Sequence, residues 1–500
     1  MRKSVITLLV LAGLALGLCA GAAQAEGTPA QLIYTEPYMV TLNPSTEMNI
    51  IWLTRSGNAS GIVEYGPTPA LGHEVTAEQF QIVGLRTSAT PEGYAGMDES
   101  FPLPSYTADP AQNPEVEVYQ LIAKLENLMP GSMVYYRVTT TEGDVAQQGE
   151  RYFFKTAPAK GESFDFVLLS DMQQRVKTRE TLHLMGQQKK DFILFAGDLV
   201  NVPWKVGEWF NYEGCYQEEG EDDRSFFECL SQNDDNCRLM QYTPIFFAPG
   251  NHEINDQRFM LDVDIATDFD GYSWSIYMQM FRPLYPEQEY GVNGKRWYSA
   301  DYGDLHINSI AVHRAYFWDG FTAPGWFTFS DISSDSDQVK WLQRDLATSD
   351  ARYKWVVMHW HMIHRGDDGW VPTSEPVADA DDPTRVSYPN GDYCYDVLRP
   401  VFEQYGVNAV NFGHSHVYER YLVNDVHYIE AASIGSNQRV ASDPYHFSGN
   451  LPVIEANEYR SFMLVNVGPD GMTAKGVQSS VEDNGIGYIG RVIEEFTIAE

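Results

Sequence analysis

The stretch "VNAVNFGHSHVYER", residues 407–420, is an apolar run that ends in two histidines one residue apart. The run over residues 407–412 is typical of a strand in the interior of a sheet, and Gly413 lets the chain turn sharply before His414 and His416. The pattern indicates that this strand end carries out a function that needs imidazole.

Four other β-rich runs also stop at chemically active side chains: "FDFVLLSD", "DFILFAGD", "TPIFFAPGNHE" and "KWVVMHWH". An aspartate after a strand is often only a helix cap, and Gly-Asn belongs in turns. In open α/β sheets, however, ligands bind outside the carboxyl ends of the strands, so residues far apart in the chain can meet there. The sequence therefore predicts one shared site formed by Asp171, Asp198, Asn251, His252, Glu253, His359, His414 and His416.

The side chains of this predicted site supply oxygen and imidazole and no thiolate. Such a set suits Zn, Mn, Fe or Co better than copper or an iron–sulfur cluster. The chain has 69 acidic and 34 basic residues and a formal net charge of −35. So acidic a chain repels nucleic acids and anionic membranes, and we expect it to bind neither. An anionic substrate would need local positive charge, which bound metal ions can provide.

The first 25 residues have the pattern of a signal peptide: Arg2 and Lys3, an apolar run, and a small-x-small sequence at residues 23–25. A single membrane-spanning helix is the alternative interpretation, but the apolar run is short. We expect a secreted or periplasmic protein with no membrane span after cleavage. In such a compartment an even number of cysteines favours disulfides over zinc, without revealing the pairing of Cys215, Cys229, Cys237 and Cys394.

Two regions with different sequence patterns follow the first 25 residues. Short strand-like runs separated by turn residues occupy residues 29–157 and predict an all-β sandwich. From residue 163 to residue 500, β-rich runs alternate with helical stretches, as expected of an α/β domain. The stretch "TAPAKGES", residues 156–163, has the composition of a linker.

The ordered motifs around Asp171, "GD" at 197–198, "GNHE" at 250–253, His359 and "GHSH" at 413–416 resemble those of the calcineurin-like metallophosphoesterase superfamily. The stretches "WYSADYGDLHINSI", "WLQRDLA" and "GHSHVYER" further resemble purple acid phosphatases, and "LENLMPGSMVYYRV" resembles a fibronectin type III domain. The resemblance implies two mixed β-sheets packed face to face and flanked by helices, preceded by an all-β fibronectin type III-like sandwich.

The resemblance also implies a dinuclear centre of two divalent or trivalent ions, with Fe, Zn or Mn the expected metals. Asp198 would bridge the two ions, and a metal-bound hydroxide would attack a phosphate monoester in line. His252 would donate a proton to the leaving group, oriented by Glu253. The implied metal ligands are Asp171, Asp198, Asn251, His359, His414 and His416.

Other positions are less determined by the resemblance. Gln173 stands where many relatives have glycine or histidine, so Gln173 and Asn201 are candidate metal ligands or neighbours of the ligands. His361, His364 and Arg365 are candidate substrate contacts, with solvent exposure as the alternative.

Asn201 occupies the position where purple acid phosphatases usually place a tyrosine, three residues after the bridging aspartate. In those proteins the phenolate holds and colours a ferric ion. We therefore expect this protein to show no tyrosinate charge-transfer band and to select Fe(III) weakly. A visible absorption spectrum of the native metal-loaded protein checks this expectation, which a purple preparation would contradict.

Two alternatives to a phosphomonoesterase stay open at this point. A phosphodiesterase acting on cyclic nucleotides or another diester would use the same metal pair. A surface or binding protein with a degenerate phosphoesterase domain is the second alternative, motivated by the changed residues 173 and 201. The sequence indicates neither the natural substrate nor the oligomeric state.

Overall fold

The chain divides into two compact units, residues 1–31 and residues 32–500. The computed structural model describes residues 31–85, 116–173, 178–201, 203, 205–210, 225–231, 238–253, 272–286, 295–312, 314–317, 325–328, 332, 334–360, 377–378, 386–387, 392–431, 433–436, 453–456, 459–480 and 488–499. The fold presented below is therefore that of the second unit. In these described ranges no helix is both long enough and apolar enough to cross a bilayer.

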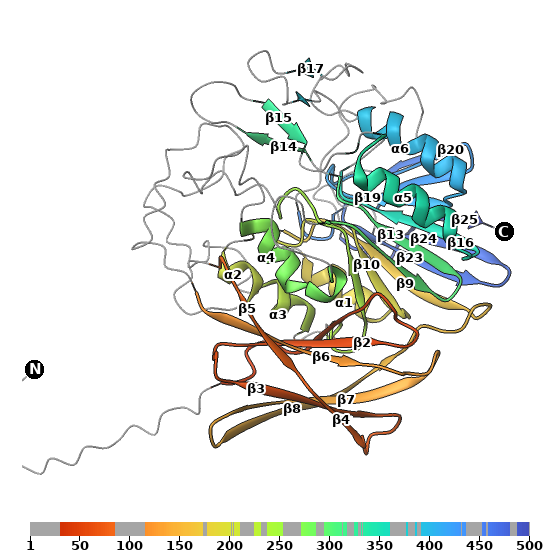
Figure 1. Ribbon diagram of the computed structural model, residues 1–500. Helices are drawn as coiled ribbons and strands as arrows, with labels where there is room; N and C mark the ends of the chain where they lie inside the picture. The colour runs from red at the N-terminus through yellow and green to blue at the C-terminus, as the bar shows by residue number, and fades with distance from the viewer. Residues whose placement is uncertain are drawn as a thin grey trace, which may run out of the picture. The chain divides into compact units, whose positions relative to one another are not determined.

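The N-terminal part is all-β, as the sequence predicts (Figure 1). One four-stranded sheet has the order β1-β2-β6-β5 and the other has the order β4-β3-β7-β8. Trp52 of β2 is buried, and its indole Nε1 donates to Thr140 Oγ1 of β7 at 2.8 Å, which ties the two sheets together. The strands are β1 Tyr38–Val40, β2 Met48–Thr54, β3 Ser60–Gly66, β4 His73–Thr76, β5 Glu78–Ile82, β6 Val118–Leu125, β7 Met133–Glu142 and β8 Val145–Lys155.

A six-stranded mixed sheet with the order β11-β10-β9-β23-β24-β25 forms the first layer of the α/β part. Its strands β9, β10 and β11 run parallel, and β23, β24 and β25 are antiparallel to their neighbours. The bounds are β9 Phe164–Leu169, β10 Phe192–Phe195, β11 Ile245–Phe247, β23 Ser461–Gly468, β24 Gly471–Gln478 and β25 Val492–Ala499.

A seven-stranded mixed sheet with the order β12-β13-β16-β19-β21-β20-β22 forms the second layer. Its central strands β13, β16, β19 and β21 are parallel. The bounds are β12 Tyr298–Tyr302, β13 Leu305–Ser309, β16 Tyr353–Val357, β19 Ala409–Phe412, β20 Tyr418–Val423, β21 Val426–Ala431 and β22 Ile454–Ala456. Two short hairpins pair β14 Arg314–Phe317 with β15 Gly325–Thr328 and β17 Val377–Ala378 with β18 Val386–Ser387.

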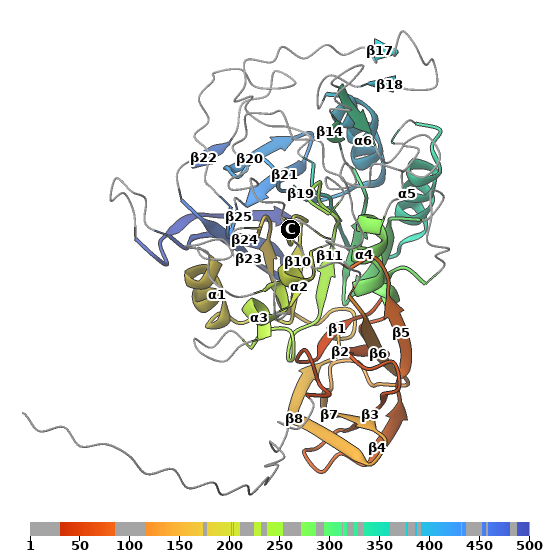
Figure 2. The same cartoon turned by 90° about the vertical axis from the view of Figure 1, so that its left-hand side faces the viewer.

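The helices cover the outer faces of these sheets (Figures 1 and 2). Helices α5 and α6 pack on the seven-stranded sheet through a buried cluster that includes Leu342, Phe402 and Val410. Between the two sheets, the rings of Phe166 and Trp355 meet edge to face at 5.1 Å. The helices are α1 Thr178–Gly186, α2 Val206–Trp209, α3 Phe226–Ser231, α4 Tyr272–Met280, η3 Arg282–Leu284, α5 Asp337–Thr348 and α6 Asp392–Tyr405. The expected fold, two mixed sheets face to face with flanking helices, is confirmed.

The sandwich and the α/β part share one hydrophobic core rather than meeting through polar surfaces. Tyr38 of β1 belongs to the same buried cluster as Phe227 and Phe281, and its ring lies 4.8 Å from that of Phe227. Tyr38 Oη and Gln120 Nε2 both donate to the carbonyl of Met280, at 2.6 and 2.8 Å. The predicted division between residues 157 and 163 remains a prediction, because residues 32–500 form one compact unit.

The disulfide prediction falls mostly outside the described part of the chain. Cys229 is buried in α3. Cys215, Cys237 and the side chain of Cys394 lie outside the described residues, so the pairing stays a prediction.

His306 on β13 contacts two carboxylates, Asp301 on β12 and Asp345 on α5. Its Nδ1 lies 2.7 Å from Asp301 Oδ1, and its Nε2 lies 2.8 Å from Asp345 Oδ2. Burial lowers the pKa of His306, but the two carboxylates outweigh burial and raise it to about 9. Because the unfolded pKa is about 6.5, the charged imidazole stabilises the fold below that pH, and this stabilisation is lost as the pH rises through 9. Allowing for the exposed Asp301, the loss amounts to roughly 2 kcal/mol.

We therefore expect the melting temperature of the wild-type protein to fall between pH 6.5 and pH 9.5, and that of His306→Gln to fall less. Thermal unfolding across this pH range checks the prediction. His427→Gln is the matched control, because burial and Arg420 lower the pKa of His427 to about 4, so this histidine is neutral throughout the range. Parallel curves for the wild type and His306→Gln would contradict the assignment.

Candidate metal centre

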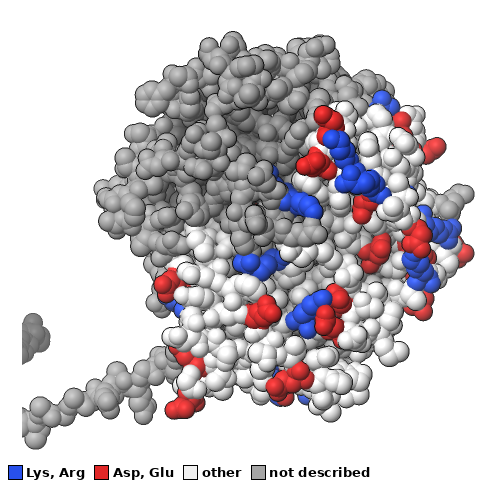
Figure 3. Space-filling model, viewed as in Figure 1, with Lys and Arg blue, Asp and Glu red and all other residues white. Residues whose placement is uncertain are grey.

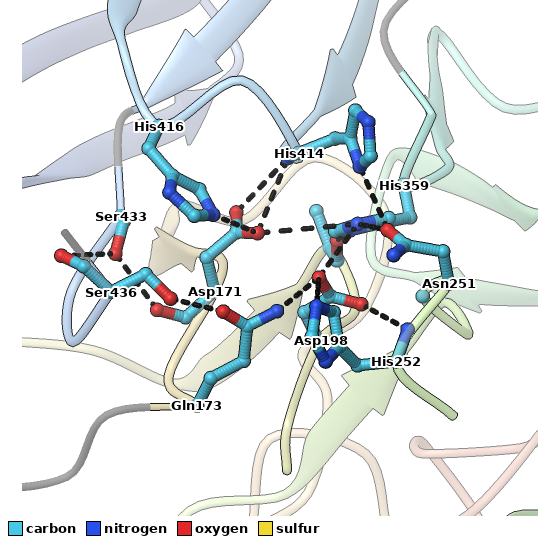
Figure 4. A network of polar contacts seen from close by, with 12 residues as sticks. Asp171, Gln173, Asp198, Asn251, His252, His359, His414, His416, Ser433 and Ser436 are labelled. Carbon is cyan, nitrogen blue, oxygen red and sulfur yellow. Dashed lines mark hydrogen bonds and ion pairs between the residues drawn. The ribbon is translucent and has the colours of Figure 1, made fainter. Parts of the chain in front are cut away.

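Five parallel strand ends meet where the two sheets face each other. Strands β9, β10 and β11 of one sheet lead to the motifs at 171, 198 and 251–253, and strands β16 and β19 of the other lead to His359 and to 414–416. Gly413 N donates to His359 O at 3.0 Å and so joins two strand ends of one sheet, while His359 Nδ1 contacts Ala196 O of the other sheet at 2.6 Å. The convergence that the sequence predicts is present (Figure 4).

Four of the candidate ligands have a left-handed backbone, which side-chain-bearing residues rarely adopt. Their φ angles are 53° for Asp171, 56° for Asp198, 81° for His414 and 60° for His416. Each side chain leaves its strand end through this turn and points toward the others (Figure 4). Strained backbone at four converging side chains indicates a functional site.

Two glycines allow the close approach of chain segments at the site. A Cβ atom on Gly250 would overlap the carboxylate and the backbone nitrogen of Asp198, and one on Gly413 would overlap the carboxylate of Asp171. The glycines of the "GNHE" and "GHSH" motifs are therefore required by packing against the two aspartates.

One group of donor atoms surrounds Asn251 Oδ1. His359 Nε2 lies 2.9 Å from this oxygen, His414 Nδ1 lies 2.7 Å from it, and His359 Nε2 lies 3.1 Å from Asp198 Oδ2. The ligand atoms of Asp198, His359 and His414 all lie within 4.8 Å of one another. Two imidazoles, an amide oxygen and a carboxylate that converge in this way fit a transition-metal ion or zinc. We call Asn251, His359 and His414 the Asn251 half of the site.

In the absence of a metal ion, the pKa values of His359 and Asp198 are both shifted toward the charged forms. Burial lowers the pKa of His359, but the carboxylates of Asp198 and Asp171 outweigh it and raise the pKa to about 10. Burial raises the pKa of Asp198, but the nearby His359 and His252 reverse the effect and hold it well below the usual value. Because the backbone carbonyl of Ala196 can only accept, Nδ1 of His359 carries a proton and Nε2 faces the acidic side. A cation is thus favoured at this position.

Asp171 and His416 form a second group beside the first, which we call the Asp171 half. His416 Nε2 lies 3.2 Å from Asp171 Oδ1, and the backbone nitrogen of His414 donates to both Asp171 oxygens at 3.3 and 3.2 Å. Asp171 Oδ1 also lies 4.0 Å from His359 Nε2, which links the two halves. The carboxylate and the imidazole of this half, together with the Asp198 carboxylate, fit a second cation.

The surroundings of His252 differ from the expectation. Glu253 was expected to orient His252, but its carboxylate instead accepts from the backbone nitrogens of Asp198, Leu199 and Gly250 at 3.1, 2.8 and 2.5 Å. His252 Nδ1 contacts the carbonyl of Asn201 at 3.2 Å. Glu253 therefore shapes the turns that carry the ligands, and Asn201 orients His252 through its backbone.

His252 keeps its imidazole at the open side of the site. Its side chain is 29% exposed, and its Nε2 lies 3.9 Å from Asp198 Oδ2. Since the Asn201 carbonyl can only accept, Nδ1 carries a proton and Nε2 is the nitrogen turned toward the site. This placement suits proton exchange with a bound molecule.

The candidate substrate contacts lie outside the described residues, so their role in substrate binding stays a prediction. They are His361, His364 and Arg365.

Two serines near the site were not predicted from the sequence. Ser433 and Ser436, which follow β21, were missed, although Ser433 Oγ donates to Asp171 O at 2.9 Å and Ser436 Oγ donates to Gln173 Oε1. The strand-end rule, applied also to "VHYIEAASIGS", would have found them.

This fold and this set of converging ligands define a metallophosphoesterase. The chain belongs to the calcineurin-like phosphoesterase family, whose model matches residues 164–418. A second model, described as the purple acid phosphatase N-terminal domain, matches residues 36–156. The chain is therefore a purple acid phosphatase-like member of the family.

Several known sequences and solved structures are similar to this chain. Purple acid phosphatase 18 of Arabidopsis thaliana is 21% identical over 77% of this chain and 66% of its own length, and the uncharacterized protein Rv2577 of Mycobacterium tuberculosis is 25% identical over 76% and 60%. The chain thus spans slightly less than two thirds of each relative. Among solved structures, purple acid phosphatase PPD1 from yellow lupin covers 92% of this chain and 73% of its own, with a TM-score of 0.61 and 15% identity. The structure of PhoD has a TM-score of 0.55 and 13% identity, and the match covers 93% of this chain and 94% of the PhoD chain. These structures support the fold.

Proposed function

We propose that the protein is an exported, dinuclear metal-dependent phosphoesterase that hydrolyses phosphate monoesters. The observation that carries the proposal is that His359 Nε2 lies 3.1 Å from Asp198 Oδ2 and 4.0 Å from Asp171 Oδ1, which brings the Asp198 carboxylate close to both halves. A carboxylate can present one oxygen to each of two cations, as dinuclear hydrolase sites require. Names such as purple acid phosphatase 18 among the similar proteins favour a monoester substrate.

Two bound ions would supply Lewis-acid activation of water and would neutralise charge on the phosphate. Asp171, Asp198, Asn251 and the histidines of both halves would hold them. Glu253 would fix the turns by its three backbone contacts. His252 would give a proton from Nε2 to the leaving oxygen, because Nδ1 is held by the Asn201 carbonyl. The chain's own residues thus bind, orient and protonate the ester.

The surface charges suit a small substrate. On the described part of the face drawn in Figure 3, basic side chains stand beside acidic ones rather than in a continuous basic patch. Among the described residues, Lys124 pairs with Glu47 and Glu126, and Arg238 pairs with Glu150. This distribution supports a small phosphate ester as the partner. That nucleic acid is not bound stays an expectation from the net charge. Export is proposed from the leader pattern of residues 1–25 alone.

A comparison of an aryl phosphate monoester with the corresponding bis-aryl diester tests the proposal. The full chain, loaded in turn with Zn²⁺, Mn²⁺ and Fe²⁺, should turn over the monoester faster. A faster diester would favour the phosphodiesterase alternative. Metal analysis well below one ion per chain, with no turnover under any added metal, would favour a non-catalytic binding protein.

A further inference from the structure

Gln173 is a buried amide whose two polar atoms both have partners (Figure 4). Its Nε2 donates to Asp198 Oδ2, and its Oε1 accepts from Ser436 Oγ. The side chain is 4% exposed, so water does not compete for either atom. The amide therefore connects the proposed bridging carboxylate to the loop after β21.

The chemistry of the partners determines which way the amide faces. An ionised carboxylate accepts hydrogen bonds and cannot donate, so the amide group next to Asp198 must be the nitrogen. The carbonyl oxygen, the only atom of Gln173 able to bind a metal, then points to the hydroxyl of Ser436. In this orientation Gln173 supplies a hydrogen bond to Asp198 and no ligand to the site.

Ser436 is itself held in several ways, which makes it a firm anchor. Its backbone nitrogen donates to Asp171 O at 3.2 Å, beside Gly435 N at 3.1 Å. Its carbonyl accepts from Arg460 Nη2 at 3.2 Å. The segment 433–436 thus forms hydrogen bonds with both the backbone of Asp171 and the side chain of Gln173.

We propose that Gln173 is a positioning residue: anchored by Ser436, it orients the Asp198 carboxylate and does not itself bind metal. The proposal rests on the proposed function, because it concerns a site that takes two ions. The Asn251 half then has four protein ligands including Asp198, whereas the Asp171 half has three. An ion with fewer protein ligands is held more weakly, so the Asn251 half fills first.

Titration of Zn²⁺ into the demetallated full chain, followed by calorimetry, tests this role without relying on turnover. The wild type should bind two ions in separate steps. Gln173→Met keeps the length of the side chain and removes both hydrogen bonds, and Ser436→Ala removes the anchor. Each should weaken the first step by about 10- to 100-fold, as loss of a partner behind a ligand does. The double variant should be no weaker than the worse single variant, because both act through one contact.

Ser231→Ala is the matched control, because this buried serine also donates to a backbone carbonyl at 2.6 Å, that of Phe227, and does so within α3. It should leave both steps unchanged. If Gln173 were a ligand, Ser436→Ala would release its carbonyl, tighten the second ion and leave the first unchanged, and this result would overturn the proposal. Two equal sites in the wild type would also overturn it.

The titration separates failure of this inference from failure of the proposed function. A wild type that binds no Zn²⁺ would refute both. Stepwise binding with the expected response of the variants, but no turnover of any phosphate ester, would refute the proposed function and leave the positioning role of Gln173 standing. Normal phosphatase turnover with unaltered Zn²⁺ binding in Gln173→Met would refute only the inference.

Discussion

Asp198→Ala and Asp198→Asn are each expected to lower kcat for an aryl phosphate by about 10³-fold or more, because the proposed metal pair would supply several kcal/mol of transition-state stabilisation. Asp198 Oδ2 contacts His359 Nε2 at 3.1 Å, and Asp198 Oδ1 accepts from the backbone nitrogen of His252 at 2.9 Å. Asparagine preserves the shape of the side chain and loses the charge that the two proposed cations would share. Metal content and kcat, measured on the same preparations, check the prediction.

His414→Ala should have a similar effect through a single ion. It removes the imidazole whose Nδ1 lies 2.7 Å from Asn251 Oδ1 and whose ring packs at 4.1 Å on Trp360. Asp350→Ala is the control, because the side chain of Asp350 is 88% exposed and pairs with Lys160 on the surface. Its kcat should equal that of the wild type. Full turnover by both Asp198→Asn and His414→Ala would rule out the metal-dependent mechanism.

The strand-end rule predicted the site because the topology of a sheet determines where strand ends lie. Parallel strands of one sheet bring their carboxyl ends to the same edge, and this geometry requires no knowledge of side-chain contacts. Asp171 and Asp198 follow strands of one sheet and could therefore be grouped from runs of apolar residues alone, whereas His359 follows a strand of the other sheet. The same rule would have added Ser433 and Ser436, but serine after a strand is so common in turns that it carries little signal by itself.

The roles of Glu253 and Asn201 could not be predicted in this way. Both depend on backbone groups, since the Glu253 carboxylate accepts from three main-chain nitrogens and Asn201 contacts His252 through its carbonyl. Such contacts follow from the exact path of a turn, which residue types do not specify. A charged residue next to a histidine is an ambiguous signal, and here the folded turn separates the two side chains.

The core that the sandwich shares with the α/β part is reflected in the sequence of β2. Every residue of β2, "MNIIWLT", is buried, whereas β7, "MVYYRVTTTE", alternates between buried and less buried positions. A near-continuous apolar strand is typical of burial on both faces. The run at 48–54 thus indicates a sheet covered on its outer side, in this case by the α/β part.

His252→Gln is expected to slow hydrolysis of an alkyl phosphate by about 10²- to 10⁴-fold, the usual contribution of a general acid. For 4-nitrophenyl phosphate the loss should stay below about tenfold, because its leaving group departs without protonation. Glutamine can still donate to the Asn201 carbonyl, and the bond from the backbone nitrogen of His252 to Asp198 does not depend on the side chain. The substitution therefore removes proton transfer while retaining the local structure.

The ratio of the two rate losses distinguishes proton donation from a purely structural role. If His252 only held the turn, His252→Gln would slow both esters by the same factor, since the damage would act on metal and phosphate binding alike. His73→Gln is the control: this histidine is exposed on β4 of the sandwich and should leave both rates unchanged. Equal losses for the two esters would exclude the acid role and would leave the leaving oxygen to be protonated by another group.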